Sequence, residues 1–454
     1  MNRICCKTAV LFLLVLVLCL SFTGCAQRPD VEEEPASEDD GTVLIGGQSF
    51  SSDTTDLIAV ISEGETEQLS KLTKLHYADL SGSGNVEEIA AWAKEHPAVS
   101  VRYTVTLPDG TVLPSDTRSY DLSGATGDEA LAAAPALSLL PGLKTLRLGT
   151  ERSTMGLDSI LKLREYLPET AFQYSFDLYG KECDLSSSSI SLFHIPVDDE
   201  AARVDLAMAC MPQLTYVDMD SCGVSNRRME ELRLKYPDVK IVWRVWFAEG
   251  YSVRTDVVRI LASKPSAAGM IDNNDIEALS CCHDVQFLDL GHNKALTDIS
   301  FVRSMPRLEV AILAMCDWSD ASPLADCPEL EYLEMQSTAC SDLTPLSGLT
   351  KLRHLNMANN LAISDISPLY GLKDLERLWI GSWTVISNEQ VEEMHRRAPN
   401  CEIDTGVYDD PTAGAWRYTP DGYMAERYYI LRLQFEDYKW SAFSFSRNDP
   451  LCPQ

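Results

Sequence analysis

Val285-Gln-Phe-Leu-Asp-Leu290 is the first of five copies of one six-residue motif. The motif returns as Leu308-Glu-Val-Ala-Ile-Leu313, Leu330-Glu-Tyr-Leu-Glu-Met335, Leu352-Arg-His-Leu-Asn-Met357 and Leu375-Glu-Arg-Leu-Trp-Ile380. Successive copies begin 22 or 23 residues apart, with apolar residues at the first, fourth and sixth positions. A fixed period of this length predicts a solenoid, whose repeats stack because one repeat cannot bury its own apolar edge.

The residues after each motif repeat as well. Three positions after the motif stand Asn293, Cys316, Thr338 and Asn360, and Trp383 after the last copy departs from this pattern. Pro-containing segments such as Ser364-Asp-Ile-Ser-Pro-Leu369 come later. Over residues 279–404 these features resemble the internalin-like leucine-rich repeats of bacteria. The resemblance implies an α/β solenoid with a parallel β-sheet on its concave side and helices or short irregular segments on its convex side. It also implies that the residue three positions after the motif caps backbone groups at the turn.

A longer period is visible upstream. The motif occurs at residues 75–80, 143–148 and 214–219, spaced by 68 and 71 residues, and residue 285 lies a further 71 residues on. A helical apolar pattern follows each of these copies and stops before a proline, where helices commonly end. We therefore expect outward-facing helices over residues 89–96, 160–167 and 229–236. The last repeat ends in the same way, before Pro399, which predicts a fourth helix over residues 391–398.

Apolar residues alternate after each of these prolines, which predicts half-buried strands over residues 99–107, 172–178 and 239–247. Turn residues such as Pro108-Asp-Gly110 and Tyr179-Gly180 then reverse the chain. A third strand-like piece follows, as at residues 119–123 and 257–261. Each 71-residue unit thus contains about three solenoid turns. We predict one continuous solenoid over residues 47–404, irregular over residues 47–278 and regular over residues 279–404.

The N-terminus predicts export. Arg3 and Lys7 precede an apolar run over residues 9–22, followed by Thr23-Gly24-Cys25. This arrangement is typical of a secretory signal, and it resembles a bacterial lipoprotein signal over residues 1–24. The resemblance implies that Cys25 is acylated and anchors the chain to the outer face of the cytoplasmic membrane, or to an outer membrane if the cell has one. An uncleaved anchor and an ordinary signal peptide are the alternatives.

Residues 25–46 are rich in Pro, Glu, Asp and Ser, which predicts a disordered acidic tether.

The net charge of the chain limits the kinds of partner that it can bind. The whole chain has a formal net charge of −30. Such a balance argues against binding of nucleic acid or anionic lipid by the folded part.

The cysteines have structural positions in this pattern. Cys222 and Cys316 fall at the turn, whereas Cys282, Cys327 and Cys401 replace buried aliphatic residues, so we expect all five to pack as small apolar groups. Cys281, Cys282 and His283 suggest a zinc site, but zinc needs four ligands and no second pair exists. We predict no metal and no cofactor. Disulfide connectivity is left open.

No catalytic motif stands out. The sequence contains no G-x-S-x-G, no H-E-x-x-H, no Walker loop and no dinucleotide-binding fingerprint. The seven histidines are scattered and have no recurring carboxylate or cysteine partner. We therefore predict that the protein is not an enzyme.

The third and fifth positions of each motif face away from the apolar core, because side chains alternate along a strand. We expect these residues to form an exposed concave surface that binds a protein or peptide: Phe287, Asp289, Val310, Ile312, Tyr332, Glu334, His354, Asn356, Arg377 and Trp379. Aromatic and arginine residues are the usual anchors of such surfaces. The alternative is that these rows pack against one another or against the C-terminal segment.

The C-terminal segment, residues 405–454, is rich in aromatic residues and lacks the motif. Open solenoid ends need a cap, so we predict that this segment is one. The alternative is a separate aromatic module, containing Trp416 and Trp440, in an envelope-structural or glycan-binding lipoprotein. The oligomeric state is left open.

Overall fold

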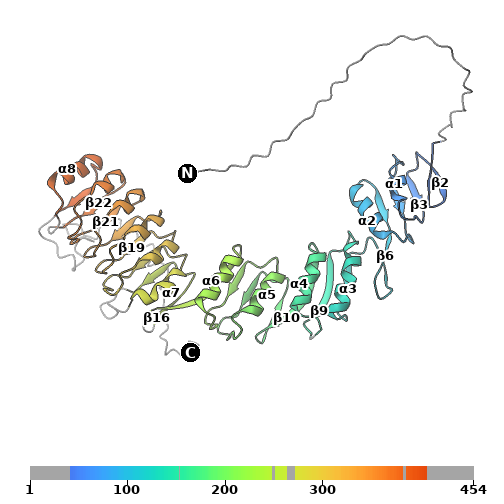
Figure 1. Cartoon of the computed structure of the whole chain (residues 1–454), viewed down its shortest axis with the longest axis horizontal. Coiled ribbons are helices and arrows are strands. Elements are labelled where there is room, and N and C mark those ends of the chain that lie inside the picture. The colour runs from blue at the N-terminus through green and yellow to red at the C-terminus, as the bar shows by residue number, and fades with distance from the viewer. Residues whose placement is uncertain (1–40, 153, 248–250, 263–270, 382–384, 406–454) are drawn as a thin grey trace, which may run out of the picture. The chain divides into compact units, whose positions relative to one another are not determined.

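The computed structural model describes residues 41–405, except residues 153, 248–250, 263–270 and 382–384 (Figure 1). The chain divides between Val101 and Arg102 into two compact units. Parallel strands of the repeat type occur in both units, but they belong to several separate sheets. The repeat-solenoid architecture is as predicted, but the expectation of one continuous parallel sheet is wrong, because the strands form several separate sheets. The boundary that we placed between residues 278 and 279 stays a prediction.

The first unit begins with an antiparallel hairpin of β1 (Thr42–Ile45) and β2 (Gln48–Ser51). The turn uses Gly46 and Gly47, whose φ angles of 55° and 74° favour glycine. Val43 and Ile45 are buried. The prediction of a disordered tether over residues 25–46 is therefore wrong for residues 42–45. These residues form a strand because the side chains of Val43 and Ile45 are buried.

The rest of the first unit is a small repeat. Its sheet has the order β3, β4, β5, and β5 runs one residue into the second unit. Helix α2 buries Ile89 and Trp92 and ends just before Pro97, as the sequence predicts. The elements are β3 (Asp56–Ile58), α1 (Thr66–Leu69), β4 (Tyr77–Asp79), α2 (Val86–Glu95) and β5 (Ser100–Arg102).

In the first part of the second compact unit, each stretch of about 71 residues contains about three solenoid turns, as the sequence predicts. Two triplets of parallel strands occur there, β8 (Ser119–Asp121), β9 (Thr145–Thr150) and β10 (Ala171–Leu178), then β12 (Ser189–Ser191), β13 (Tyr216–Asp218) and β14 (Lys240–Val242). An antiparallel hairpin is formed at or directly after the third strand of each 71-residue stretch. The hairpins are β6 (Thr104–Thr106) with β7 (Val112–Pro114), β10 with β11 (Lys181–Asp184), and β15 (Arg244–Phe247) with β16 (Tyr251–Arg254). These antiparallel insertions separate one parallel sheet from the next.

The four predicted helices are confirmed, and each begins three residues earlier than expected. Three of them are α4 (Leu157–Tyr166), α6 (Asn226–Lys235) and α8 (Asn388–Arg397). Ser225 and Ser387 cap the last two by accepting hydrogen bonds from backbone N–H groups in the first turn. The structure adds α3 (Gly127–Ser138) and α5 (Ala202–Cys210), and α3, α4 and α5 pack successively (Figure 1).

The regular repeats form one parallel sheet in continuous register. Its strands are β17 (Arg259–Leu261), β18 (Phe287–Asp289), β19 (Val310–Ile312), β20 (Tyr332–Glu334), β21 (His354–Asn356), β22 (Arg377–Trp379) and β23 (Glu402–Asp404). A second layer stacks α7 (Ile276–Ser280), η2 (Ser300–Ser304), η3 (Ser322–Asp326), η4 (Thr344–Gly348), η5 (Ser367–Gly371) and α8 in that order; η1 (Asn273–Asp275) precedes it. Proline opens η3, η4 and η5, where a missing N–H costs nothing.

The core of these repeats lies between the sheet and this second layer. The fourth position of each motif is at most 1% exposed, at Leu288, Ala311, Leu333, Leu355 and Leu378. The turn after each strand also matches the prediction. The side-chain amide of Asn293 donates to Leu290 O at 2.7 Å, that of Asn360 donates to Met335 O at 2.8 Å, and Cys316 Sγ donates to Leu290 O at 3.3 Å.

Candidate functional site

The strand face is the set of side chains at the third and fifth positions of the motif on β18–β22. Its members are the ten residues predicted to bind a ligand: Phe287, Asp289, Val310, Ile312, Tyr332, Glu334, His354, Asn356, Arg377 and Trp379. Because side chains alternate along a strand, all ten lie on the side opposite the leucine core. The parallel register sets them in two rows, one of third positions and one of fifth positions.

We predicted that these side chains are exposed, and that prediction is wrong. Nine of the ten are buried, with exposed fractions from 0% at Tyr332 to 8% at Phe287, and Asp289 alone is half-buried. Part of the reason is mutual packing. Strands only about 4.8 Å apart hold large neighbours in contact, and the apolar members form one cluster: Phe287, Val310, Ile312, Tyr332, Ala358 and Trp379.

Two arginine side chains lie close to aromatic rings along the two rows. The guanidinium of Arg259 lies 5.7 Å from the ring centre of Phe287, and that of Arg377 lies 5.4 Å from the ring centre of Trp379. The rings of Tyr332 and His354 are 5.6 Å apart and tilted by 40°. Cation–π contacts of this kind are worth more where water is excluded.

A carboxylate lies at the middle of the strand face. Glu334 is fully buried, and its Oε1 accepts a hydrogen bond from the Tyr332 hydroxyl at 2.9 Å. Its Oε2 accepts from Gln336 Nε2 at 3.4 Å. A buried charge is costly without partners, so these donors hold the carboxylate in place.

His354 lies beside Tyr332 on the next strand, where Asn356 is the neighbour of Glu334. Burial, followed by the charges of Arg377 and Arg353, lowers the pKa of His354 to about 4. Its Nε2 is 3.7 Å from Glu376 Oε2. At neutral pH the imidazole is therefore uncharged and contributes a ring and two polar nitrogens to the face.

Three buried polar atoms of this region have no hydrogen-bond partner among the described residues. They are Gln336 Oε1, Asn356 Nδ2 and His354 Nδ1. Asn356 uses its other polar atom, because Oδ1 accepts from Ala358 N–H at 3.0 Å. A buried polar atom left unsatisfied costs about 1–3 kcal/mol. The strand face therefore presents donor and acceptor groups suited to a bound polypeptide.

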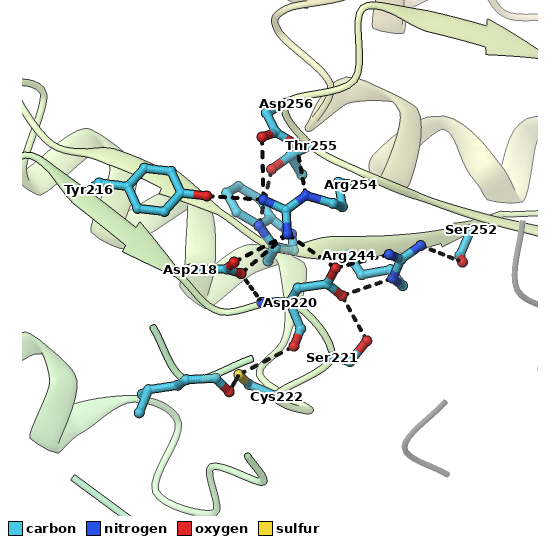
Figure 2. Close-up of polar contacts among 12 residues, drawn as sticks. Tyr216, Asp218, Asp220, Ser221, Cys222, Arg244, Ser252, Arg254, Thr255 and Asp256 are labelled. Carbon is cyan, nitrogen blue, oxygen red and sulfur yellow. Dashed lines mark hydrogen bonds and ion pairs between the residues drawn. The ribbon is translucent and has the colours of Figure 1, made fainter. Parts of the chain in front are cut away.

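A second polar cluster lies at β13 and the β15–β16 hairpin (Figure 2). Asp220, two residues after β13, is fully buried and paired with Arg244 through contacts of 2.8 and 2.9 Å. Arg254 reaches Asp220 at 3.3 Å, Asp218 at 3.3 Å and Asp256 at 3.1 Å. The hairpin is thereby attached to the preceding repeat.

The polar groups of this cluster form hydrogen bonds with one another. Ser221 Oγ donates to Asp220 Oδ1 at 2.7 Å, and Arg254 Nη2 donates to the Tyr216 hydroxyl at 3.0 Å. Burial raises the pKa of Asp220, but Arg244 outweighs that effect by hydrogen bonding and charge, so the pKa lies below its ordinary value. Both carboxylate oxygens of Asp220 are engaged, which indicates a structural role. Our sequence reasoning missed the cluster, because Arg244 and Arg254 reach it only through the hairpin.

The cysteines behave as predicted. Cys222, Cys282, Cys316, Cys327 and Cys401 are buried, and the nine described cysteines are free thiols. Burial raises the pKa of Cys282 to about 12 and keeps that thiol protonated. Within the described residues, no group of three or more His, Cys, Asp or Glu side chains is placed to hold a metal ion.

A hollow of about 450 Å³ lies at β11 and β12. Its lining includes Lys181, Cys183, Asp184 and several serines. Lys181 Nζ donates to Ser191 O. Burial raises the pKa of Cys183, so this thiol is not activated as a nucleophile.

The predicted signal, Cys25 and the C-terminal segment from residue 406 lie outside the described residues. None of the helices that the structure does describe has the length and apolar character to cross a membrane.

The sequence matches no protein-family profile and no curated protein. Among solved structures, the chain is similar to internalin C2 of Listeria monocytogenes, with 21% identity, a TM-score of 0.29 and coverage of 48% of this chain and 80% of that one. A second Listeria monocytogenes internalin is 15% identical over 79% of this chain and 83% of its own, with a TM-score of 0.26. A leucine-rich-repeat protein of Leptospira interrogans is 13% identical over 74% and 91%, with a TM-score of 0.22. These likenesses are low and concern the fold alone.

Proposed function

We propose that this protein is a non-enzymatic recognition protein whose strand face binds a polypeptide. Parallel strands set aromatic rings and arginines in two straight rows, and repeated geometry of this kind fits an extended chain. One observation carries the proposal. Gln336, His354 and Asn356 each bury a polar atom that has no hydrogen-bond partner within the described residues, and backbone N–H and C=O groups of a bound chain would satisfy such atoms.

The ligand class follows from the chemistry of the face. Aromatic side chains offer apolar contact, whereas Glu334 and Asp289 favour donors and cations. The expected ligand is an extended peptide that carries apolar and basic side chains.

A displayed library of random peptides, panned on the full chain, tests this proposal. Enriched peptides should be rich in aromatic, Arg and Lys residues. Tyr332→Ala should weaken their binding at least about tenfold, while Tyr77→Ala, at the same motif position on β4, should leave it unchanged. A library that yields no sequence, together with retention on purified cell-wall glycan that Trp440→Ala abolishes, would favour the glycan-binding alternative.

We also propose that the protein is exported and held to a membrane by a lipid on Cys25. The basic start, the apolar run and Thr23-Gly24-Cys25 support this proposal. Cys25→Ala should release the protein from the membrane fraction and remove the mass of the acyl groups. If the variant stays membrane-bound with an unchanged mass, the lipid anchor is disproved.

A further inference from the structure

The strand face is buried over a limited set of strands. On β19, β20, β21 and β22 all three residues of the strand are buried, so both faces of the sheet are covered there. On β13 and β4 the outer positions are only half-buried. On β23, the last strand, Glu402 is exposed and Asp404 is half-buried. Burial of the outward-facing strand side chains is thus greatest on β19–β22 and decreases toward β23.

We propose that the C-terminal segment of this chain, residues 406–454, lies across the strand face as a tethered ligand. This inference rests on the proposed function, because it assumes that the face binds a polypeptide. It differs from an end cap, which would cover the last strand first. Half-burial of Asp289 on β18 and exposure of Glu402 on β23 mark the two margins of the covered region.

The length of the segment suffices. β23 ends at Asp404 on the edge of the sheet that carries the strand face. From β23 to β18 there are five strand spacings, about 24 Å. An extended chain covers that distance in about eight residues, and 49 residues follow Thr405. The segment can therefore cross the face and return.

One stretch of the segment, residues 427–435, matches the face in composition. Arg427-Tyr-Tyr-Ile-Leu-Arg-Leu-Gln-Phe435 contains three aromatic residues, two arginines and no acidic residue. Its cations complement Glu334 and Asp289. Its backbone can supply the donors and acceptors that Gln336 Oε1, His354 Nδ1 and Asn356 Nδ2 need. Apolar, charged and hydrogen-bonding groups thus correspond between the two surfaces.

Cleavage of the full chain tests the proposal. A site for a specific protease is inserted between Thr405 and Gly406, the folded protein is cut, and gel filtration at micromolar concentration follows residues 406–454. The fragment should co-elute with the body. Tyr332→Ala combined with Trp379→Ala should increase its release at least about tenfold, whereas Tyr77→Ala should not. Immediate separation of the fragment from the parent protein would overturn the proposal.

Glu334→Gln provides a test that does not depend on removing a large core side chain. This change keeps the shape of Glu334 and removes its charge, so it should speed release of the fragment and weaken the effect of salt on release. Circular dichroism checks that each variant is folded. Retention that is the same in the parent, the double variant and Glu334→Gln would place the fragment elsewhere on the body and overturn the proposal.

The same material separates this inference from the proposed function. The peptide library is panned on the uncut protein and on the body after the fragment has been displaced. Retention of the fragment with no peptide enriched on the free body would leave the tethered segment standing and contradict binding of external partners. Separation of the fragment, with peptides that bind the uncut chain through Tyr332, would contradict the tethered segment alone.

Discussion

Tyr216 and Tyr332 occupy the same third position of the strand motif, yet their environments differ. Tyr216 is half-buried on β13, where Arg254 from the β15–β16 hairpin donates to its hydroxyl. Tyr332 is fully buried on β20, where it donates to Glu334. The irregular repeats thus complete their strand surface with an inserted hairpin, whereas the regular repeats have a covered aromatic surface. The motif determines which way a side chain points, and the rest of the chain determines what it meets.

The largest expected effect comes from removing the buried tyrosine. Tyr332→Ala should lower the free energy of unfolding by about 3–5 kcal/mol, because it opens a cavity in a packed cluster and removes a donor from Glu334. Tyr77→Ala, at the same position on β4 and half-buried, should cost about 1 kcal/mol. Urea unfolding followed by circular dichroism measures both. Equal losses would show that motif position, and not burial, decides the cost.

The ion-pair network of the irregular repeats gives the next effect. Asp220→Ala should destabilise the protein by about 3 kcal/mol, because it leaves the largely buried Arg244 without its bidentate partner. The matched control is Asp121→Ala, since Asp121 pairs with Arg147 at 3.5 Å but is about half exposed. Exposed pairs contribute at most about 1 kcal/mol. A small loss for Asp220→Ala would mean that the hairpin is held by other contacts.

Acid should affect the strand face through His354. Its folded-state pKa of about 4 lies below the ordinary value of 6.5, so the unfolded chain binds more protons between these two values. The contribution of neutral His354 to the free energy of unfolding is therefore fully present above pH 6.5. It decreases as pH drops toward 4, by at most about 3 kcal/mol. His354→Gln should flatten this part of the curve. Burial and Arg233 also lower the pKa of His283, so a slope of the same sign from His283 remains in the variant. An unchanged curve would contradict the buried, neutral state of His354.

Local patterns predicted the repeats because they are encoded within a few residues. The 22–23-residue period, the helices before the prolines and the turn residues Asn293 and Asn360 are all confirmed. Helix α3 was within reach of the sequence, since Thr126 and Glu129 form a capping box at its start. We missed it because we followed apolar periodicity alone.

Other features depend on contacts between distant residues. The run over residues 239–247 has one alternating pattern, but its two halves belong to different sheets, β14 and the β15–β16 hairpin. Arg244 and Asp220 meet only after that division. Burial of the strand face likewise depends on what covers β19–β22. Alternation predicts which side of the sheet a residue faces but not whether that side meets solvent.

The smallest effect concerns the turn residues that link one repeat to the next. Asn360 Nδ2 donates to Met335 O, and Asn360 Oδ1 accepts from Thr338 N–H at 2.7 Å, so one side chain satisfies two backbone groups of the preceding repeat. Asn360→Ala should cost about 1–2 kcal/mol by leaving those groups unpaired. At the equivalent turn, Cys316 donates to Leu290 O at 3.3 Å and to Ala314 O at 3.6 Å. A thiol is a weak donor, so Cys316→Ala should cost less than Asn360→Ala in the same urea titration. Asn388→Ala, at the exposed start of α8, controls for loss of an amide and should be nearly neutral. If Cys316→Ala proved the more damaging change, filling of the core would outweigh hydrogen bonding at these turns.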